Sequence, residues 1–254
     1  MLPLQDIRVL DFSTLLPGPL ASLILAEAGA EVIKVERPGG EDMRGYPPQL
    51  DGTGGGFALL NRGKRSLEVD LRAPGAARRL LDLAPSIDIV LEQFRPGVMA
   101  RLGLGYEAWR EANPRILYCA ITGYGQDGPR AMEAGHDMNY AARAGLLGLT
   151  AGSDGAPGII PTLIGDIGGG TYPAVVNLLL ALRRRDRTGE GCYIDVAMTD
   201  NLFTFLFWGL AMGHGTGAWP KPGAEQLTGG SPRYRIYRTA DGRHLAVAPL
   251  EEKF

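Results

Sequence analysis

IRVLDFSTLLPGPLASLILAEAGAEVIKVE, residues 7–36, is the stretch that decides the fold. Its two ends, residues 7–12 and 31–36, are β-branched, apolar runs of strand length, and both predict strands. Residues 20–30 are rich in alanine and leucine with a glycine near the end, which predicts a helix after the Pro17-Gly18-Pro19 turn. A strand–helix–strand unit of this kind normally belongs to a parallel sheet.

The alternation of strands and helices continues as far as residue 198. Only GGEDMRGYPPQLDGTGGG, residues 39–56, interrupts it, because its glycines and prolines predict an irregular loop. We therefore predict an α/β fold whose Rossmann-like large domain, residues 1–197, contains a mostly parallel sheet. Further strands are expected at 65–71, 87–92, 116–122 and 192–198, and helices at 74–86, 106–114, from about 138, and at 168–185.

The pattern changes after residue 198. Residues 200–215, DNLFTFLFWGLAMGHG, predict an apolar helix that is buried or packed against a partner. Residues 233–251 predict a hairpin that turns at residues 240–242, and an isolated hairpin is only marginally stable. We therefore expect a helix and linker at 198–225, followed at 226–254 by the incomplete start of a smaller α+β domain in a C-terminally truncated chain.

Composition and charge exclude several classes of protein. The 254 residues carry a formal net charge of −2, which gives no general electrostatic reason to bind nucleic acid or a membrane surface. The apolar runs are too short or too interrupted to span a bilayer, and the N-terminus has no signal-peptide pattern. Cys119 and Cys192 lack CxxC spacing, so we expect neither a metal site nor a disulfide framework, and a reduced, cytoplasmic setting.

Nucleotide-binding motifs are missing from the places where they would be needed. Glu36 ends the second strand, as an acid that holds a dinucleotide ribose would. However, the first turn, STLLPGPLAS at residues 13–22, has prolines where a GxGxxG motif requires glycines. The glycine runs at 54–56 and 168–170 lack the GK[ST] ending of a P-loop. We therefore reject both an NAD site and a P-loop.

Cationic side chains follow several of the predicted strands. Arg37 ends the second strand, Arg101 follows a Pro-Gly turn, and Lys64 lies beside another turn. Open α/β sheets bind ligands at the carboxyl ends of their strands, and guanidinium groups can grip phosphates there through two hydrogen bonds. The alternative for each residue is an ordinary solvated surface charge.

Asp166 and His136 each allow two interpretations. Asp166 precedes the glycines at 168–170 and a long predicted helix, so it is either a helix N-cap or an acid placed where a ligand approaches bare backbone. His136 lies in AGHDMNYAARAG, residues 134–145, where Gly-His-Asp is a plausible helix start. Asp137 is interpreted as a helix cap rather than a catalytic group. The residues alone leave both alternatives open for His136 and Asp166.

Seven segments together resemble the family III CoA-transferases and the related α-methylacyl-CoA racemases, closest to the racemase branch. The resemblance covers nearly the whole chain in the family's order and implies coenzyme A binding. It also implies an interlocked homodimer, which fits the apolar run 202–210, and a part in fatty-acid metabolism. The segments are residues 8–45, 61–71, 94–107, 121–130, 134–145, 165–172 and 227–254.

The same resemblance implies roles for individual residues. Asp166 matches the catalytic carboxylate of the family, and His136 in GHDMNY matches the catalytic base of the racemases. Glu251 matches an acid that pairs with that histidine, whereas the neighbouring Glu252 is interpreted as a solvent-exposed residue. The implied contacts to coenzyme A are Arg37, Lys64, Phe94, Arg101 and Tyr140.

The residues and the resemblance together lead to three candidate functions. The first is racemisation of the α-carbon of a 2-methylacyl-CoA thioester by two bases, His136 and Asp166, without a cofactor beyond the coenzyme A of the substrate. The second is transfer of coenzyme A between carboxylic acids through an Asp166 anhydride and thioester. GGEDMRG and NRGKRS, residues 39–45 and 61–66, resemble the transferase branch. The third is a non-catalytic acyl-CoA-binding protein.

Overall fold

The chain forms two compact units in a computed structural model, which describes residues 1–152, 154–251 and 253. The first, here called the sheet unit, comprises Met1–Ala134 and Gly165–Asn201. The second, here called the helix–hairpin unit, comprises Gly135–Ile164 and Leu202–Phe254. This division differs from the predicted large domain 1–197, because the chain leaves the sheet after its fifth strand and returns only for the sixth.

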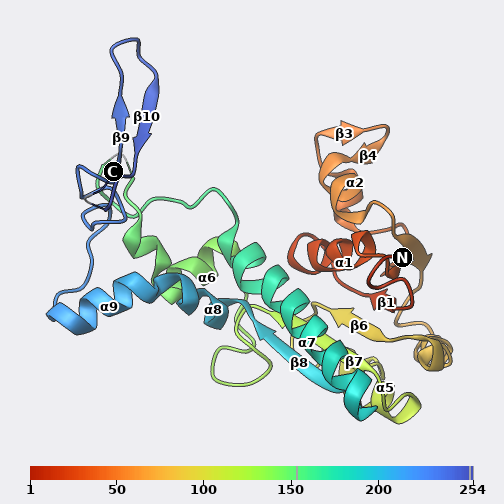
Figure 1. Cartoon of the computed structure of the whole chain (residues 1–254). Coiled ribbons are helices and arrows are strands. Elements are labelled where there is room, and N and C mark those ends of the chain that lie inside the picture. Colours follow the sequence, from red (N-terminus) through yellow and green to blue (C-terminus); the bar gives the residue numbers. More distant parts are fainter. Residues whose placement is uncertain (153, 252, 254) are drawn as a thin grey trace. The chain divides into compact units, whose positions relative to one another are not determined.

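The sheet unit contains six parallel strands in the order β5-β2-β1-β6-β7-β8 (Figure 1). The strand order therefore reverses between β1 and β6, as in doubly wound α/β folds, and the predicted α/β class is confirmed. The strands are β1 (Arg8–Asp11), β2 (Glu31–Glu36), β5 (Arg65–Glu68), β6 (Ile89–Glu92), β7 (Leu117–Thr122) and β8 (Cys192–Ala197).

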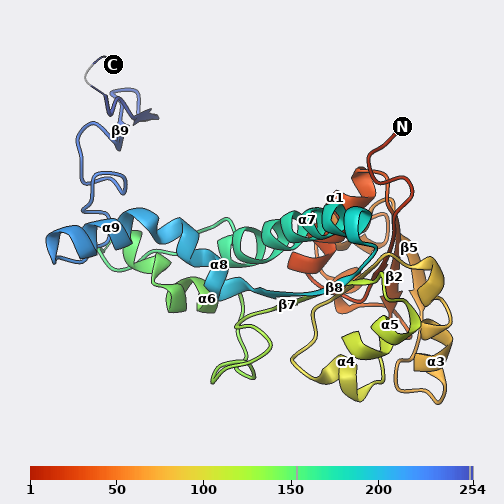
Figure 2. The same cartoon turned by 60° about the horizontal axis from the view of Figure 1, so that its bottom comes forward.

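Helices cover both faces of this sheet. Figure 2 shows α1 (Pro17–Glu27) and α7 (Tyr172–Thr188) on one face, and α3 (Ala76–Leu81), α4 (Val98–Arg101) and α5 (Tyr106–Ala112) on the other. A short turn, η2 (Ala84–Ser86), follows α3. Because both faces are covered, β6 and β7 are buried along their whole length, which explains why their sequences are mostly apolar.

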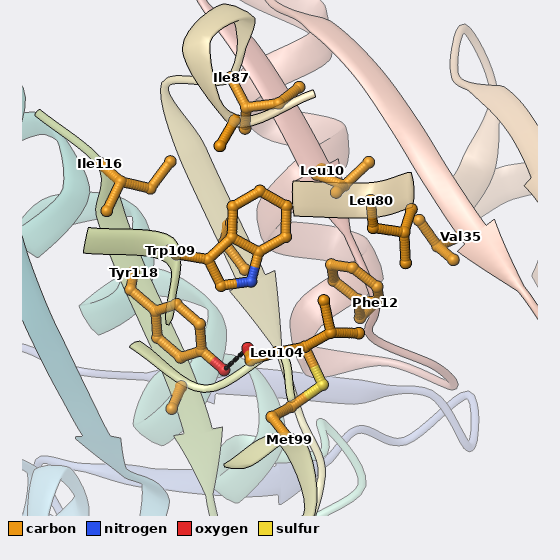
Figure 3. Packing of buried hydrophobic residues seen from close by; sticks show 13 residues of the cluster. Leu10, Phe12, Val35, Leu80, Ile87, Met99, Leu104, Trp109, Ile116 and Tyr118 are labelled. Carbon is orange, nitrogen blue, oxygen red and sulfur yellow. Dashed lines mark hydrogen bonds between the residues drawn. The ribbon is translucent and has the colours of Figure 1, made fainter. Parts of the chain in front are cut away.

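The core under α3, α4 and α5 is built around Trp109, which is fully buried (Figure 3). The Tyr118 hydroxyl, on β7, donates a hydrogen bond of 3.4 Å to the Leu104 carbonyl in the same core. Leu10 and Phe12 from the end of β1 complete this layer and lead to the carboxyl edge of the sheet. The core thus supports the loops that follow β1 and β6.

Residues 39–56 are more regular than predicted. They contain η1 (Asp42–Gly45), the two-residue strands β3 (Gln49–Leu50) and β4 (Thr53–Gly54), and the beginning of α2 (Gly55–Asn61). One of the glycines that predicted a loop, Gly54, serves packing instead, because a Cβ there would lie 2.1 Å from the Met43 carbonyl oxygen. The prediction of an irregular loop was therefore wrong.

The helix–hairpin unit contains the predicted hairpin, formed by β9 (Arg235–Arg238) and β10 (His244–Val247). The predicted apolar helix 200–215 is broken into α8 (Met198–Asn201), which belongs to the sheet unit, then η5 (Leu202–Leu206) and α9 (Phe207–Thr216). The unit also contains α6 (Asp137–Ala144) and η3 (Leu146–Leu149). Within the described part of the chain, no helix is both long enough and apolar enough to cross a membrane.

Candidate active site and coenzyme-binding cavity

A cavity of about 830 Å³ lies in the sheet unit, beyond the carboxyl ends of β1, β2, β5 and β6. It therefore occupies the position where doubly wound sheets bind ligands, beside the reversal of strand order. Its lining mixes aromatic, aliphatic, acidic and basic side chains. The lining residues are Phe12, Thr14, Leu15, Val35, Glu36, Arg37, Glu41, Asp42, Tyr46, Val69, Asp70, Leu71, Arg72, Phe94, Val98, Arg101 and Leu102.

Three of the predicted coenzyme contacts line this cavity together: Arg37, Phe94 and Arg101. Arg37 follows β2, and its guanidinium donates to the Gly40 carbonyl at 3.0 Å and forms an ion pair with Asp42. Both partners of that pair are more than half exposed, so the pair is weak and Arg37 can exchange it for a ligand anion. Arg72, which sequence reasoning missed, also lines the cavity.

The buried acid Glu36 is not available for a ribose. Arg44 donates to both of its carboxylate oxygens, at 2.6 and 2.8 Å, and Ser66 donates to it at 2.6 Å. Burial raises the pKa of Glu36, but these hydrogen bonds and one from the Glu41 backbone outweigh burial and lower it to about 2. Glu36 is therefore a charged anchor for the segment that carries Arg44.

Lys64, also predicted to contact coenzyme A, lies outside the cavity lining. Its side chain is 1% exposed, and its ammonium donates to the Pro19 carbonyl and to Asn61 Oδ1, each at 2.8 Å. Asp11 Oδ2 lies 3.5 Å from the same ammonium. The structure thus places Lys64 beneath the loop after β1.

Asp166 lies in the first turn of a π-helical segment, η4 (Gly165–Thr171), that runs directly into α7. The N-cap of α7 is Thr171 rather than Asp166, so the simple N-cap interpretation of Asp166 is not what the structure shows. π-Helical turns are rare and are frequent at functional sites. Asp166 is partly exposed at this turn.

The glycines after Asp166 have a packing explanation. A Cβ on Gly169 would lie 2.4 Å from the Met198 carbonyl oxygen, and one on Gly170 would lie 3.0 Å from Pro17 Cβ. Both glycines are buried against the chain itself. The interpretation that the glycine run exists for the approach of a ligand was therefore wrong for these two residues.

His136, in the helix–hairpin unit, is the exposed N-cap residue of α6. Its backbone N–H donates to Asn139 Oδ1 at 3.0 Å, as one half of a capping box at the start of the helix. Asp137, interpreted above as the cap, is instead the first residue of the helix and is buried. His136 therefore both begins the helix and presents a titratable ring.

The two other predicted site residues of this unit differ in their exposure. Tyr140 is buried, and its hydroxyl donates to the Gly135 carbonyl at 2.5 Å, so it fixes the loop before His136. Glu251 follows β10 and is exposed. Glu252 lies outside the described residues.

Glu92 is a buried acid behind the cavity wall that sequence reasoning missed. It ends β6, only 5% of it is exposed, and its carboxylate accepts a 2.7 Å hydrogen bond from the Phe94 N–H in the cavity wall. Burial raises the pKa of Glu92 to about 7, although that hydrogen bond opposes the change. The available signal was an acid at the end of the strand IVLE, residues 89–92, whose other residues are apolar.

The doubly wound sheet and its large cavity define an α/β protein with a ligand site at the carboxyl edge. Residues 4–254 match the CoA-transferase family III, and the chain belongs to that family. Human alpha-methylacyl-CoA racemase is 38% identical over 255 residues, which cover 99% of this chain and 62% of the racemase. Succinyl-CoA:mesaconate CoA-transferase from Haloarcula hispanica is 41% identical, over 78% of this chain and 52% of that enzyme.

A solved structure supports the same assignment. A CAIB/BAIF family protein from Brucella suis has a TM-score of 0.87 and 33% sequence identity, over 97% of this chain and 66% of that chain. The family is thus one of enzymes that includes both racemases and CoA-transferases. The chain spans 52–62% of the length of the two curated relatives named above.

Proposed function

We propose that this protein acts on acyl-CoA thioesters and inverts the α-carbon of a 2-methylacyl-CoA. The observation that carries the proposal is the cavity at the carboxyl edge of the sheet, where Arg37, Arg101 and Phe94 converge. Guanidinium groups suit the phosphates of coenzyme A, and an aromatic ring suits its adenine. Neither a metal nor a redox cofactor is part of the proposal, because proton transfer at an acidified α-carbon requires only bases and a polarised carbonyl.

The chemistry is assigned to Asp166 and His136. Inversion requires one group to remove the α-proton from one face while another delivers a proton to the opposite face. A carboxylate at a helix start and an exposed imidazole on α6 are two bases of different type on separate segments. Glu251 is proposed to hold the orientation of the imidazole and to make it a stronger base, since a carboxylate partner raises histidine basicity.

The enolate that forms between the two proton transfers must be stabilised. The N-terminal end of a helix carries the positive end of its dipole. The start of η4 beside Asp166 therefore suits the thioester oxygen as negative charge develops on it.

Transfer of coenzyme A is the alternative, and the transferases among the relatives favour it. In that reaction the Asp166 carboxylate attacks the donor thioester. A mixed anhydride of Asp166 and the donor acyl group forms, and coenzyme A leaves as the thiolate. The thiolate then attacks the anhydride to give an Asp166 thioester and release the donor acid. The acceptor carboxylate displaces coenzyme A once more, and the thiolate finally converts the acceptor anhydride into the product thioester.

Incubation with a chiral 2-methylacyl-CoA in deuterated water distinguishes the two reactions. A racemase incorporates one deuterium at the α-carbon and inverts the centre, whereas a transferase does neither. A covalent adduct on Asp166 that hydroxylamine traps, in the absence of α-deuterium, would show that the protein is a transferase and not a racemase. A cytoplasmic location and an interlocked homodimer are also part of this proposal. Sedimentation of the protein tests the dimer.

A further inference from the structure

Two lysine side chains are buried beneath the segment Ser13–Pro19, here called the loop, which comprises the turn after β1 and the first residues of α1. The side chains of Lys34 and Lys64 are 2% and 1% exposed, and neither lines the cavity. A buried ammonium group is costly unless charged and polar partners compensate its lost hydration. Their partners therefore indicate what the two lysines hold in place.

The two ammonium groups hold the two ends of the loop. Lys34 Nζ donates to the Ser13 carbonyl at 2.7 Å and lies 2.7 Å from the Glu41 carboxylate. Lys64 Nζ donates to the Pro19 carbonyl at 2.8 Å. The first and the last carbonyl of the loop thus each accept a hydrogen bond from a buried cation, which is about twice as strong as one between neutral groups.

Asp11 completes the anchor at the start of the loop. Its carboxylate accepts hydrogen bonds from the Ser13 N–H at 2.8 Å and from the hydroxyls of Ser13 and Ser22 at 2.5 Å each. Between the anchored ends, Leu15 has a φ of +61°, a conformation that costs energy for a leucine. The loop retains this conformation because both of its ends are fixed.

The other side of the loop contacts the segment that carries Asp166. Thr171, the fully buried last residue of η4, donates from Oγ1 to the Pro17 carbonyl at 2.8 Å. Gly170 packs on Pro17 so closely that a Cβ there would lie 3.0 Å from Pro17 Cβ. The loop and η4 both belong to the sheet unit. A shift of the loop therefore moves the end of η4.

We propose that Lys64 is a positioning residue for Asp166. Lys64 holds the Pro19 carbonyl, the loop transmits this constraint to Thr171, and Thr171 fixes the π-helical turn that carries the carboxylate. The catalytic meaning of this coupling rests on the proposed function of Asp166. The mechanical coupling between Lys64, the loop and η4 is independent of that function.

The coupling depends on pH. Burial lowers the pKa of Lys64 to about 8, with Asp11 on β1 and Glu41 opposing the change and Lys34 on β2 adding to it. A neutral amine has two N–H donors for the three acceptors around it, which are Asp11, Pro19 and Asn61. The loop and η4 therefore loosen as the pH rises through 8.

Hydrogen–deuterium exchange of the full chain tests the coupling without any substrate. Lys64→Met keeps a side chain of similar length and removes its donors. We expect amide exchange in residues 12–19 and in residues 165–171 to accelerate by about tenfold, the effect of losing one charge-assisted hydrogen bond. The matched control is Arg62→Met. Arg62 precedes Lys64 by two residues, is half-exposed and is paired with Glu27, so its replacement should leave both segments protected.

Wild-type protection, corrected for the intrinsic pH dependence of exchange, should fall at 165–171 between pH 7 and 9. The Lys64→Met variant should show no such step. Acceleration confined to residues 12–19, with 165–171 unchanged, would overturn the proposal. If Lys64→Met does not fold, Thr171→Val provides the test, because it removes only the hydroxyl that donates to the Pro17 carbonyl. Unchanged amide exchange at residues 165–171 in Thr171→Val would also overturn the proposal.

Kinetics separate this inference from the proposed function. If Asp166 is catalytic, Lys64→Met should lower kcat by about 10- to 100-fold through misplacement of the carboxylate, with KM for the thioester little changed. The alkaline limb of the kcat profile near pH 8 should also disappear. Absence of α-proton exchange in the wild type, together with the expected amide exchange, would refute the proposed function and leave the coupling standing.

Discussion

Arg44 donates hydrogen bonds to both carboxylate oxygens of Glu36, at 2.6 and 2.8 Å, and its guanidinium lies 3.9 Å from the centre of the Phe57 ring. This arrangement joins the end of β2 to η1 and to α2, and both β2 and η1 contribute residues to the lining of the cavity. An acid that a dinucleotide fold would offer to its cofactor is here a structural ion.

Glu36 should make the protein sensitive to acid. Its pKa is about 2 in the folded protein and near 4.5 when unfolded, so its contribution is fully present above pH 4.5 and is lost as the pH falls toward 2. Glu36→Gln should therefore lower the free energy of unfolding by about 2–3 kcal/mol at pH 7 and by much less at pH 2.5. Urea unfolding at several pH values measures this, and a difference that does not vary with pH would contradict it.

Glu92 should make the protein less stable as the pH rises, which is the opposite of the effect of Glu36. Its folded-state pKa of about 7 lies above the unfolded value, so the native state binds more protons between pH 4.5 and 7 and loses stability as the pH rises through that window. Glu92→Gln, which stays neutral, should gain on the order of 2 kcal/mol over the wild type between pH 5 and pH 8. Glu107→Gln, at an 82% exposed side chain, is the control and should show no such trend.

Coenzyme A affinity should depend on the cavity arginines. Arg101→Ala or Arg37→Ala should weaken binding by about 1.5–3 kcal/mol, because each removes a charge-assisted contact to a phosphate. Arg110→Ala, an exposed arginine of α5 outside the cavity lining, should bind as the wild type does. Isothermal titration calorimetry with free coenzyme A decides, and unchanged affinity in both cavity variants would remove the site.

His136→Ala, Asp166→Asn and Glu251→Gln should each reduce α-deuterium exchange while thioester binding persists, since the lost groups act mainly in the transition state. Loss of one general base typically costs about 10²–10⁴ in rate. Normal transfer of coenzyme A in His136→Ala, with no turnover in Asp166→Asn and no α-deuterium exchange in the wild type, would favour the transferase.

Gly169→Ala should destabilise the protein through packing alone. The new methyl group would lie 2.4 Å from the Met198 carbonyl oxygen, which belongs to backbone and cannot easily move aside. Overpacking of this kind costs about 1–3 kcal/mol, measurable as a lower Tm. Gly148→Ala, where a Cβ meets no atom within 4 Å, is the control. An unchanged Tm in Gly169→Ala would restore the ligand-based interpretation of that glycine.

The order of strands and helices was predictable because it depends on local pattern. Residues 31–36 and 117–122 form strands with the expected bounds or within one residue of them. The prediction for residues 39–56 failed because glycine was interpreted as a sign of an irregular loop, whereas Gly54 is required by close contact with Met43. Local sequence does not reveal which distant backbone approaches a glycine.

The candidate site was predictable only in part, for the same reason. Arg37 and Arg101 were found because they follow strands, and the carboxyl ends of parallel strands meet at one edge. Lys64 carried the same signal yet is buried beneath the Ser13–Pro19 loop. Its true neighbours, Asp11 and Pro19, lie more than 40 positions away, and that contact exists only in the folded chain.

The insertion of residues 135–164 between β7 and β8 has a kinetic consequence. Ala120 pairs with Asp195, 75 positions later, so the sixth strand joins only after a long segment has been synthesised and its loop has been closed. Until then β7 is an apolar edge strand with unpaired backbone groups, the kind of edge that recruits other chains. The growing polypeptide is therefore most prone to aggregate between the emergence of β7 and that of β8, and a chaperone that covers β7 would act in that interval.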